Sequence, residues 1–115
     1  MIYKKLGNTD IEVSVVGLGT MTYGEQNTSD EACEQMDYAM ARGVNLFDVA
    51  EMYPVPPKAE TQGRTEEYIG SWFANSRRRK DWILATKATG PREEFDFLRG
   101  GPRFTREHLI EAVDN

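Results

Sequence analysis

Three short apolar runs alternate with three helical patterns along this chain, and the alternation limits the folds open to it. The runs cover residues 16–20, 44–48 and 82–86, and the helical patterns cover residues 29–42, residues 65–77 and a segment that Thr105 begins. Alternating strands and helices predict right-handed crossovers between parallel strands. The order is compatible with a doubly wound sheet and with the first part of a (β/α)8 barrel. A typical barrel needs roughly 250 residues, so 115 residues would supply less than half of one.

Two further strand-like runs, at residues 2–6 and 11–16, precede this pattern. The residues between them, Gly7, Asn8, Thr9 and Asp10, are typical of a turn. We therefore expect the chain to open with a β-hairpin.

The helical segments carry start and stop signals. Thr28 with Glu31 three residues later fits a capping box, and Gly43 provides a C-terminal stop. Apolar residues recur at helical spacing on one face of each helix. These residues are Ala32, Cys33, Met36, Ala39 and Met40 in the first helix, Tyr68, Ile69, Trp72 and Phe73 in the second, and Leu109, Ile110 and Val113 in the third.

The composition is that of an ordinary globular protein, with 39% apolar and 29% charged residues. A net charge of −5 argues against a nucleic-acid partner and against an anionic membrane surface. No run approaches the ~18 apolar residues of a membrane helix, and the N-terminus lacks the apolar core of a signal peptide. The single cysteine, Cys33, can form no internal disulfide. We therefore expect a cytoplasmic protein, and we expect no metal site.

Residues 44–53 join a strand to a loop that carries polar groups. Asp48 stands where the apolar run ends, Tyr53 follows on the loop, and Lys87 ends the next strand. Because neighbouring parallel strands lie ~4.8 Å apart, we expect Asp48 and Lys87 to pair. A nearby ammonium lowers the pKa of a tyrosine, which would let Tyr53 donate a proton near neutral pH. The alternative is a structural Asp48–Lys87 pair beside an unrelated tyrosine.

Gly17 and Gly19 follow a strand and invite comparison with a dinucleotide-binding fingerprint. That fingerprint needs a third glycine three residues later, where a helix begins. This chain has Thr22 at that position, and its first helix is expected only near residue 29. We therefore reject a Rossmann site, and infer that the two glycines let the strand end pack closely.

Three motifs in order resemble the N-terminal part of the aldo-keto reductases. They are Gly-Leu-Gly-Thr-Met at 17–21, Asn-Leu-Phe-Asp-Val-Ala-Glu-Met-Tyr at 45–53, and Ala-Thr-Lys at 85–87. Residues 51–57 and 61–63 resemble the bacterial Tas-like branch, which is related to potassium-channel β subunits. The resemblance implies an α/β fold, the N-terminal portion of a (β/α)8 TIM barrel preceded by a β-hairpin. Residues 1–115 would then form one partial barrel, the hairpin plus the first three β/α units.

The resemblance also implies a reaction, the reduction of aldehydes or ketones to alcohols with NADPH. Tyr53 matches the family's general acid, Lys87 the lysine that lowers the pKa of that tyrosine, and Asp48 the aspartate paired with the lysine. Hydride transfer to the carbonyl carbon of a small-molecule substrate would be accompanied by protonation of its oxygen by Tyr53.

The cofactor-binding residues are implied in the same way. Thr20, Met21 and Asp48 match positions beside the nicotinamide and its ribose, and Gln26 matches a further cofactor contact. The hydride chemistry belongs to the cofactor, and the protein supplies orientation and a proton.

One catalytic residue of the family has no counterpart, a histidine that ends the fourth strand. The only histidine here, His108, is expected on the surface of the third helix. We therefore expect an N-terminal fragment that is inactive alone. We also expect it to self-associate through exposed half-barrel surfaces. The alternative is an NADP-binding regulatory or interaction module with little turnover.

Overall fold

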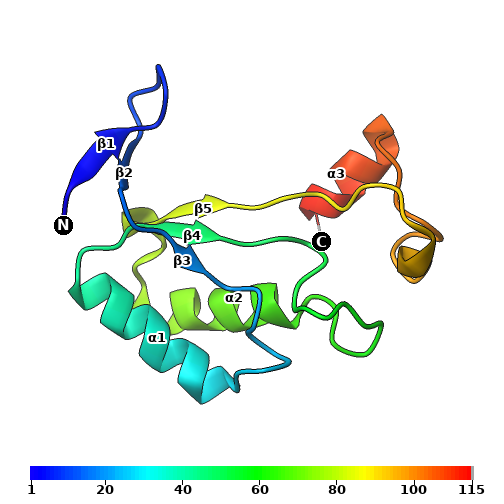
Figure 1. The fold of residues 1–115 in the computed structure, drawn as a ribbon, viewed down its shortest axis with the longest axis horizontal. Helices are drawn as coiled ribbons and strands as arrows, with labels where there is room; N and C mark the ends of the chain where they lie inside the picture. Colours follow the sequence, from blue (N-terminus) through cyan, green and yellow to red (C-terminus); the bar gives the residue numbers. More distant parts are fainter. Residues whose placement is uncertain (115) are drawn as a thin grey trace.

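The computed structural model describes residues 1–114. A β-hairpin comes first, followed by strands and helices in alternation (Figure 1). In chain order the elements are β1 (Tyr3–Lys5), β2 (Glu12–Ser14), β3 (Leu18–Gly19), α1 (Ser29–Ala41), β4 (Leu46–Asp48), α2 (Arg64–Ser76), the 3-10 turn η1 (Arg79–Asp81), β5 (Ile83–Ala85), the 3-10 turn η2 (Glu93–Phe95) and α3 (Arg106–Asp114).

The predicted hairpin is confirmed, because β1 and β2 pair in antiparallel fashion. Asn45, which directly precedes β4, holds the hairpin against the rest of the fold. Its side-chain oxygen accepts a hydrogen bond from the backbone N–H of Ser14 at 2.7 Å. The Tyr3 hydroxyl donates to the carbonyl of Gly43 at 2.7 Å. These bonds hold the hairpin near the amino ends of the parallel strands, leaving their carboxyl ends free of it (Figure 1).

The strands β3, β4 and β5 form a parallel sheet in chain order, as the alternation predicts. Each has two or three residues and is shorter than the predicted run. Backbone pairing nevertheless continues past the strand ends. The N–H of Val49 donates to the carbonyl of Ala85 at 2.9 Å, and the N–H of Glu51 donates to the carbonyl of Lys87 at 3.1 Å. The polypeptide therefore stays in register where β4 and β5 turn into loops.

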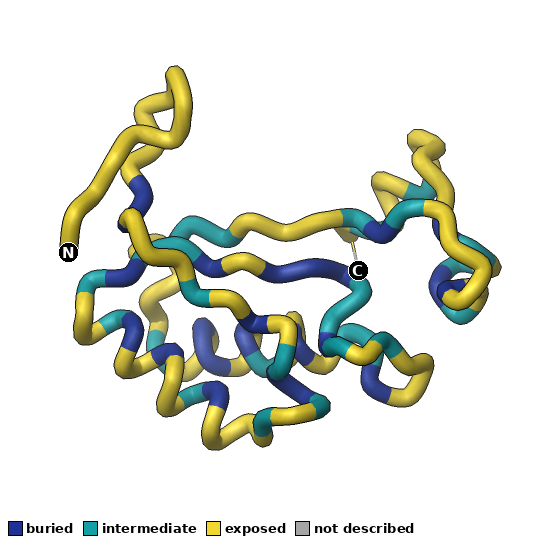
Figure 2. Tube along the Cα trace, viewed as in Figure 1, coloured by how far each residue is buried: buried dark blue, intermediate teal, exposed yellow. Residues whose placement is uncertain are grey.

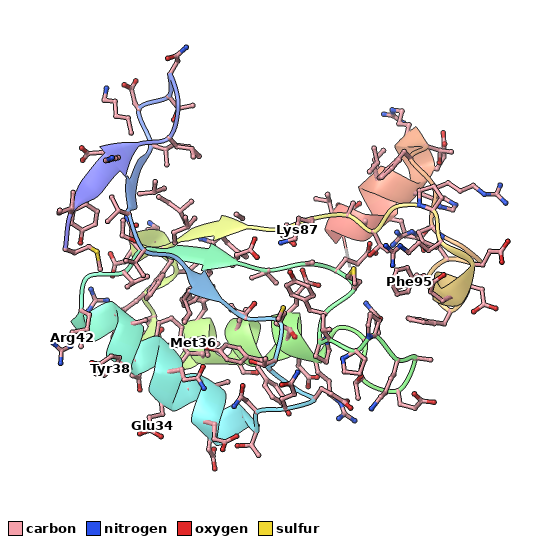
Figure 3. The ribbon with its side chains drawn as sticks, in the orientation of Figure 1. Glu34, Met36, Tyr38, Arg42, Lys87 and Phe95 are labelled. Atoms are coloured by element: carbon pink, nitrogen blue, oxygen red, sulfur yellow. The ribbon has the colours of Figure 1, made fainter. Side chains whose placement is uncertain are left out.

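Helices α1 and α2 cover one face of this sheet (Figure 1). The capping box predicted for α1 is confirmed, since Thr28 and Glu31 exchange both of its hydrogen bonds. The predicted apolar face is buried at Ala32, Met36 and Ala39. Figure 3 shows Met36 on the side of α1 that faces α2 and the sheet.

An aromatic cluster joins the sheet to α2. Phe47 of β4 is fully buried and stacks on Trp82, with ring centroids 3.9 Å apart. Trp72 and Phe73 of α2 lie 6.0 and 5.9 Å from the same ring. Burial of such large rings is the main source of core stability. Figure 2 shows buried residues concentrated between the sheet and the two helices, while the hairpin is mostly exposed.

Residues 88–103 connect β5 to α3 and include buried residues. Phe95, Leu98 and Pro102 are buried there. Helix α3 begins directly after Thr105, as predicted. The Thr105 hydroxyl caps the helix by accepting a hydrogen bond from the N–H of His108 at 3.3 Å.

The predicted apolar stripe of α3 is exposed within residues 1–114, from 41% at Leu109 to 79% at Val113. In the same part of the chain, no helix is long and apolar enough to cross a membrane.

Candidate functional site

The sheet has one face covered by helices and one open face, and the predicted catalytic residues lie on the open one. Side chains alternate along a strand, so Phe47 points into the helix layer and its neighbour Asp48 points the opposite way. On β5 the same alternation places Ala85, and then Lys87 two residues beyond it, on the open face. The Asp48 and Lys87 side chains are 55% and 48% exposed. Strand pairing thus brings together two residues that are 39 positions apart.

The Lys87 ammonium bridges the ends of β4 and β5. Its Nζ donates to Asp48 Oδ1 at 2.7 Å and to the carbonyl oxygen of Val49 at 2.6 Å. Burial alone would lower the pKa of Lys87. The hydrogen bond to Asp48 and the electrostatic effects of Tyr53 and Asp48 more than offset this, so the pKa lies above its usual value. The expected pairing of Asp48 with Lys87 is present, and the ammonium is held in its charged form.

Tyr53 lies on the loop after β4 and faces this ammonium. Lys87 Nζ is 5.1 Å from the centroid of the Tyr53 ring. The backbone of Tyr53 is fixed on both sides, because its N–H donates to Ala50 at 3.0 Å and its carbonyl accepts from Gly63 at 3.1 Å. The fold therefore collects Asp48, Tyr53 and Lys87 at the carboxyl ends of two neighbouring strands.

The residues expected to contact a cofactor surround the same strand ends. The Thr20 hydroxyl is fully buried and donates to the Asp48 carbonyl at 2.8 Å, whereas Met21 is 49% exposed. The Gln26 side-chain N–H donates to the carbonyl of Val55 at 3.1 Å, so this amide also supports the loop that carries Tyr53. The donor of the Thr20 hydroxyl is therefore used inside the protein.

His108 does not join this group. Its Nδ1 accepts a hydrogen bond from the backbone N–H of Arg103 at 3.1 Å, at the start of α3. Within the part of the chain that the structure describes, no hydrogen bond or ion pair connects it to Asp48, Tyr53 or Lys87. His108 was not predicted to belong to the site, and its position in the structure agrees with that prediction.

Sequence reasoning gave no role to Glu51, a buried acid between Asp48 and Tyr53. Its carboxylate pairs with Arg99 and accepts the N–H of Thr89 at 2.8 Å. An acid directly after the apolar residues 49 and 50 is a weak signal for a buried ion pair. Arg99 lies 48 positions away in an irregular segment, where no periodicity could have identified it.

Comparison with known proteins places this arrangement in a family. Residues 15–115 match the model of the aldo/keto reductase family. The chain belongs to this family. It is 48% identical over 114 residues to Protein tas of Escherichia coli, a match that covers 98% of this chain and 33% of that protein. It is also 40% identical over 92 residues to the oxidoreductase YrpG of Bacillus subtilis, covering 79% of this chain and 27% of that protein.

Solved structures of the family agree with the fold. An aldo-keto reductase of Bacillus halodurans in its holo form is 32% identical and superposes with a TM-score of 0.75, covering 99% of this chain and 34% of that one. A candidate aldo-keto reductase of Pseudomonas aeruginosa is 28% identical, with a TM-score of 0.74 and coverage of 98% and 40%. The predicted fold, a hairpin followed by part of a (β/α)8 barrel, is confirmed. The chain spans about a third of the length of the curated relatives it matches.

Proposed function

We propose that this chain carries the proton-donating part of a site that reduces aldehydes or ketones to alcohols with NADPH. The observation that carries the proposal is the double role of Lys87. Its ammonium is bonded to Asp48 at 2.7 Å and lies 5.1 Å from the ring centroid of Tyr53. Family membership supports an oxidoreductase activity, and the three side chains supply the groups that a carbonyl reduction needs for its proton.

In this mechanism Tyr53 acts as general acid. Its hydroxyl gives a proton to the carbonyl oxygen as negative charge develops there. The phenolate left behind is stabilised by the Lys87 ammonium, because a nearby cation favours the charged form of an acid. Asp48 keeps Lys87 charged and fixes its position through the hydrogen bond between them.

The strand ends offer groups that fit the nicotinamide and ribose end of NADPH. Asp48 presents a half-exposed carboxylate that can accept bonds from ribose hydroxyls. Met21 presents a half-exposed apolar side chain suited to a flat ring. Thr20 holds the backbone beneath them through its bond to Asp48, and Gln26 remains a predicted contact. When bound, the cofactor would supply the hydride.

The test is the change Tyr53→Phe in the complete polypeptide, expressed from the whole coding sequence. We expect carbonyl reduction to fall by about 100-fold or more, while NADPH binding, followed by fluorescence, stays unchanged. Tyr38→Phe is the matched control, because Tyr38 is 62% exposed on α1, and it should leave turnover intact. Retained turnover in Tyr53→Phe would refute the assignment.

A second proposal is an NADP-binding regulatory or interaction module with little turnover, supported by the half-exposed Asp48 carboxylate and Met21 side chain that fit the cofactor. Tight NADPH binding without turnover on a broad aldehyde panel would support this alternative over the enzyme.

We further propose that the 115 residues behave as a partial barrel that is inactive alone and self-associates. The exposed apolar residues of α3 and of the segment before β3 support this, among them Val15 at 50%, Val16 at 54% and Val113 at 79%. The edges of a three-stranded parallel sheet also offer unpaired backbone groups. Sedimentation velocity of the 115-residue chain should show concentration-dependent oligomers. A monomeric chain that consumes NADPH would contradict this proposal.

A further inference from the structure

Glu51 is a central junction between the two loops at the carboxyl ends of β4 and β5. Both oxygens of its buried carboxylate are bonded to the guanidinium of Arg99, one of them at 3.1 Å from Nη2. One of these oxygens also accepts the N–H of Thr89 at 2.8 Å. The backbone of Glu51 donates to Lys87 at 3.1 Å and accepts from the Gln62 side chain at 2.9 Å. Glu51 therefore joins residues 50–63 directly to residues 87–99.

This junction is adjacent in sequence to two of the three groups of the proposed site. Glu51 is two residues before Tyr53 and three after Asp48. Its bond partners Lys87 and Thr89 belong to the segment that carries the ammonium. A displacement of residues 88–99 relative to residues 50–53 would therefore change the separation of the phenol from the ammonium. A guanidinium can bind both oxygens of one carboxylate at once, so it suits a contact that fixes two loops relative to each other.

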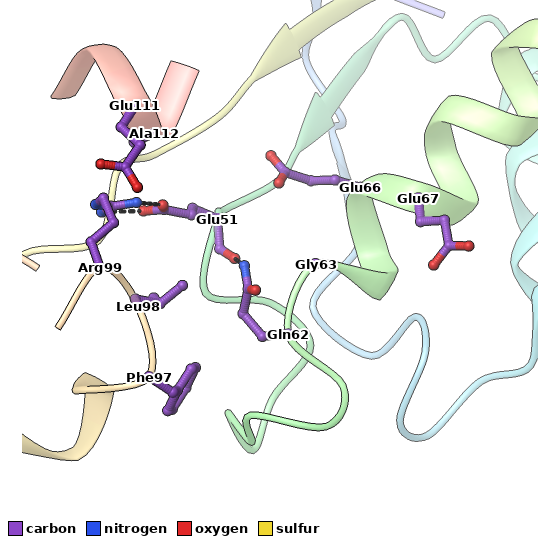
Figure 4. Close-up of a pocket in the computed structure, with 10 residues that line it drawn as sticks. All are labelled: Glu51, Gln62, Gly63, Glu66, Glu67, Phe97, Leu98, Arg99, Glu111 and Ala112. Carbon is purple, nitrogen blue, oxygen red and sulfur yellow. Dashed lines mark hydrogen bonds and ion pairs between the residues drawn. The ribbon is translucent and has the colours of Figure 1, made fainter. Parts of the chain in front are cut away.

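The residues around Arg99 show that its charge is paired with Glu51 and is not available to an anionic ligand. A cleft of about 510 Å³ opens beside the pair. Figure 4 shows that Glu66, Glu67 and Glu111 also line it. Arg99 is the one cation among the lining residues that the structure describes, and its side chain is only 5% exposed. An acidic cleft repels the phosphates of a dinucleotide, so the Arg99 charge is used within the protein.

We propose that the Glu51–Arg99 pair is a positioning device that holds Tyr53 against Lys87, an inference that rests on the proposed function of these two residues. In this proposal Glu51 and Arg99 are not in contact with substrate or cofactor. They act through the backbone of the two loops, so that the phenol and the ammonium keep the separation that proton donation requires. Misplacing reacting groups by about 1 Å can cost roughly 100-fold in rate.

The first measurement needs no turnover. Lys87 lies over the Tyr53 ring, so its side-chain methylene protons should show a ring-current shift in the NMR spectrum of the 115-residue chain. Tyr53→Leu defines the value without the ring. We expect Arg99→Met to lose most of this shift. Lys58→Met is the matched control, since it removes the ion pair of Lys58 with Glu25 from the same loop, and it should keep the shift.

The second measurement is kinetic and uses the complete polypeptide. Arg99→Met should lower kcat by roughly 10- to 100-fold and leave the KM for NADPH within about twofold. Arg99→Lys keeps the cation but loses the forked geometry, so it should fall between wild type and Arg99→Met in both measurements. Arg99→Lys also serves if Arg99→Met does not fold, which circular dichroism would reveal.

An unchanged ring-current shift in folded Arg99→Met or Arg99→Lys would overturn the positioning role, whatever the turnover. Full turnover in Tyr53→Phe would instead refute the general-acid assignment. In that case the ring-current comparison still decides whether the pair positions Tyr53. The two proposals therefore fail by different results.

Discussion

Phe47 and Asp48 are neighbours in sequence and belong to opposite faces of the same strand. Phe47 is fully buried among the rings of Trp72 and Trp82. The Asp48 side chain is 55% exposed and holds a lysine from the next strand. The covered face is completed by helices that this chain supplies itself. The open face presents the polar groups of the proposed site.

The difference separates stability from chemistry in a physical way. Apolar burial on the covered face contributes kilocalories per side chain, whereas a half-exposed ion pair contributes about 0–1 kcal/mol because water screens it. The Asp48–Lys87 pair is therefore poorly explained as a stabilising device. The pair instead positions the positive charge of Lys87 beside Tyr53. The first two of the following changes should each act on one face and spare the other.

The largest effect is expected from Phe47→Ala on the covered face. Removing a buried phenyl ring and leaving a cavity should reduce the free energy of unfolding by about 3–5 kcal/mol. Urea denaturation followed by tryptophan fluorescence measures it. Phe104→Ala is the control, because Phe104 is 68% exposed, and it should cost less than about 1 kcal/mol. Equal effects of the two changes would show that burial on the covered face does not determine the loss of stability.

On the open face, Lys87→Met should show the opposite profile. The complete polypeptide should lose about 100-fold or more in kcat, since Tyr53 would lose the cation that stabilises its phenolate. The free energy of unfolding should change by less than about 1 kcal/mol. Paired measurements of kcat and urea denaturation test this. A large loss of stability with unchanged kcat would make the pair structural after all.

The junction between the loops should respond to acid. Burial alone would raise the pKa of Glu51, but the bonds from Arg99 and Thr89 more than offset this, so the pKa lies below its usual value. A depressed folded-state pKa means that the stabilisation is present above the unfolded value of about 4.3 and is lost as the pH falls through the folded value. Glu66 and Glu111, which line the same cleft, carry charge of the same sign as Glu51 and act against this stabilisation.

The measurement is the thermal midpoint of wild type minus that of Glu51→Gln between about pH 7 and pH 3. The difference should favour wild type at neutral pH and shrink below about pH 4.5. Acids that do not interact with Glu51, such as Glu31, titrate alike in both proteins and cancel. The pKa of Glu66, which is raised by burial and by the Glu51 charge, differs between them. A difference that does not change with pH would show that the Glu51 charge contributes nothing.

The smallest effect is expected from Thr28→Ala at the start of α1. The Thr28 hydroxyl accepts the N–H of Glu31 at 3.3 Å, and losing a cap of this kind costs about 1 kcal/mol. Urea denaturation measures the loss. Ser29→Ala, one residue later and without a capping bond, should be close to neutral. If both variants were neutral, the α1 terminus would be stabilised by packing alone.

The sequence predicted the fold well because its signals are local. The capping box at Thr28, the turn after residue 6 and the apolar periodicity of α1 and α2 each lie within a few residues, and each is present in the structure. The Asp48–Lys87 pair was also predictable, because neighbouring parallel strands bring their carboxyl ends to one edge. Its catalytic role stays a prediction.

The Glu51–Arg99 pair and the burial of Phe95 were not predictable. Residues 88–103 have no periodicity, and their conformation follows from contacts across the chain. An acid in an apolar stretch indicates that a partner is needed, but says nothing about which cation supplies it.

The sequence alone therefore determined the order of strands and helices and the edge at which Asp48, Tyr53 and Lys87 collect. Hydrogen bonding and side-chain alternation act over a few residues and can be read directly. Only the tertiary structure decided that Arg99 neutralises Glu51. It also decided that the Thr20 hydroxyl and one N–H of the Gln26 amide donate inside the protein, and that Glu51 bonds to the loop after β5. These outcomes depend on which residues, distant in the sequence, become neighbours when the chain folds. Local sequence patterns do not specify those neighbours.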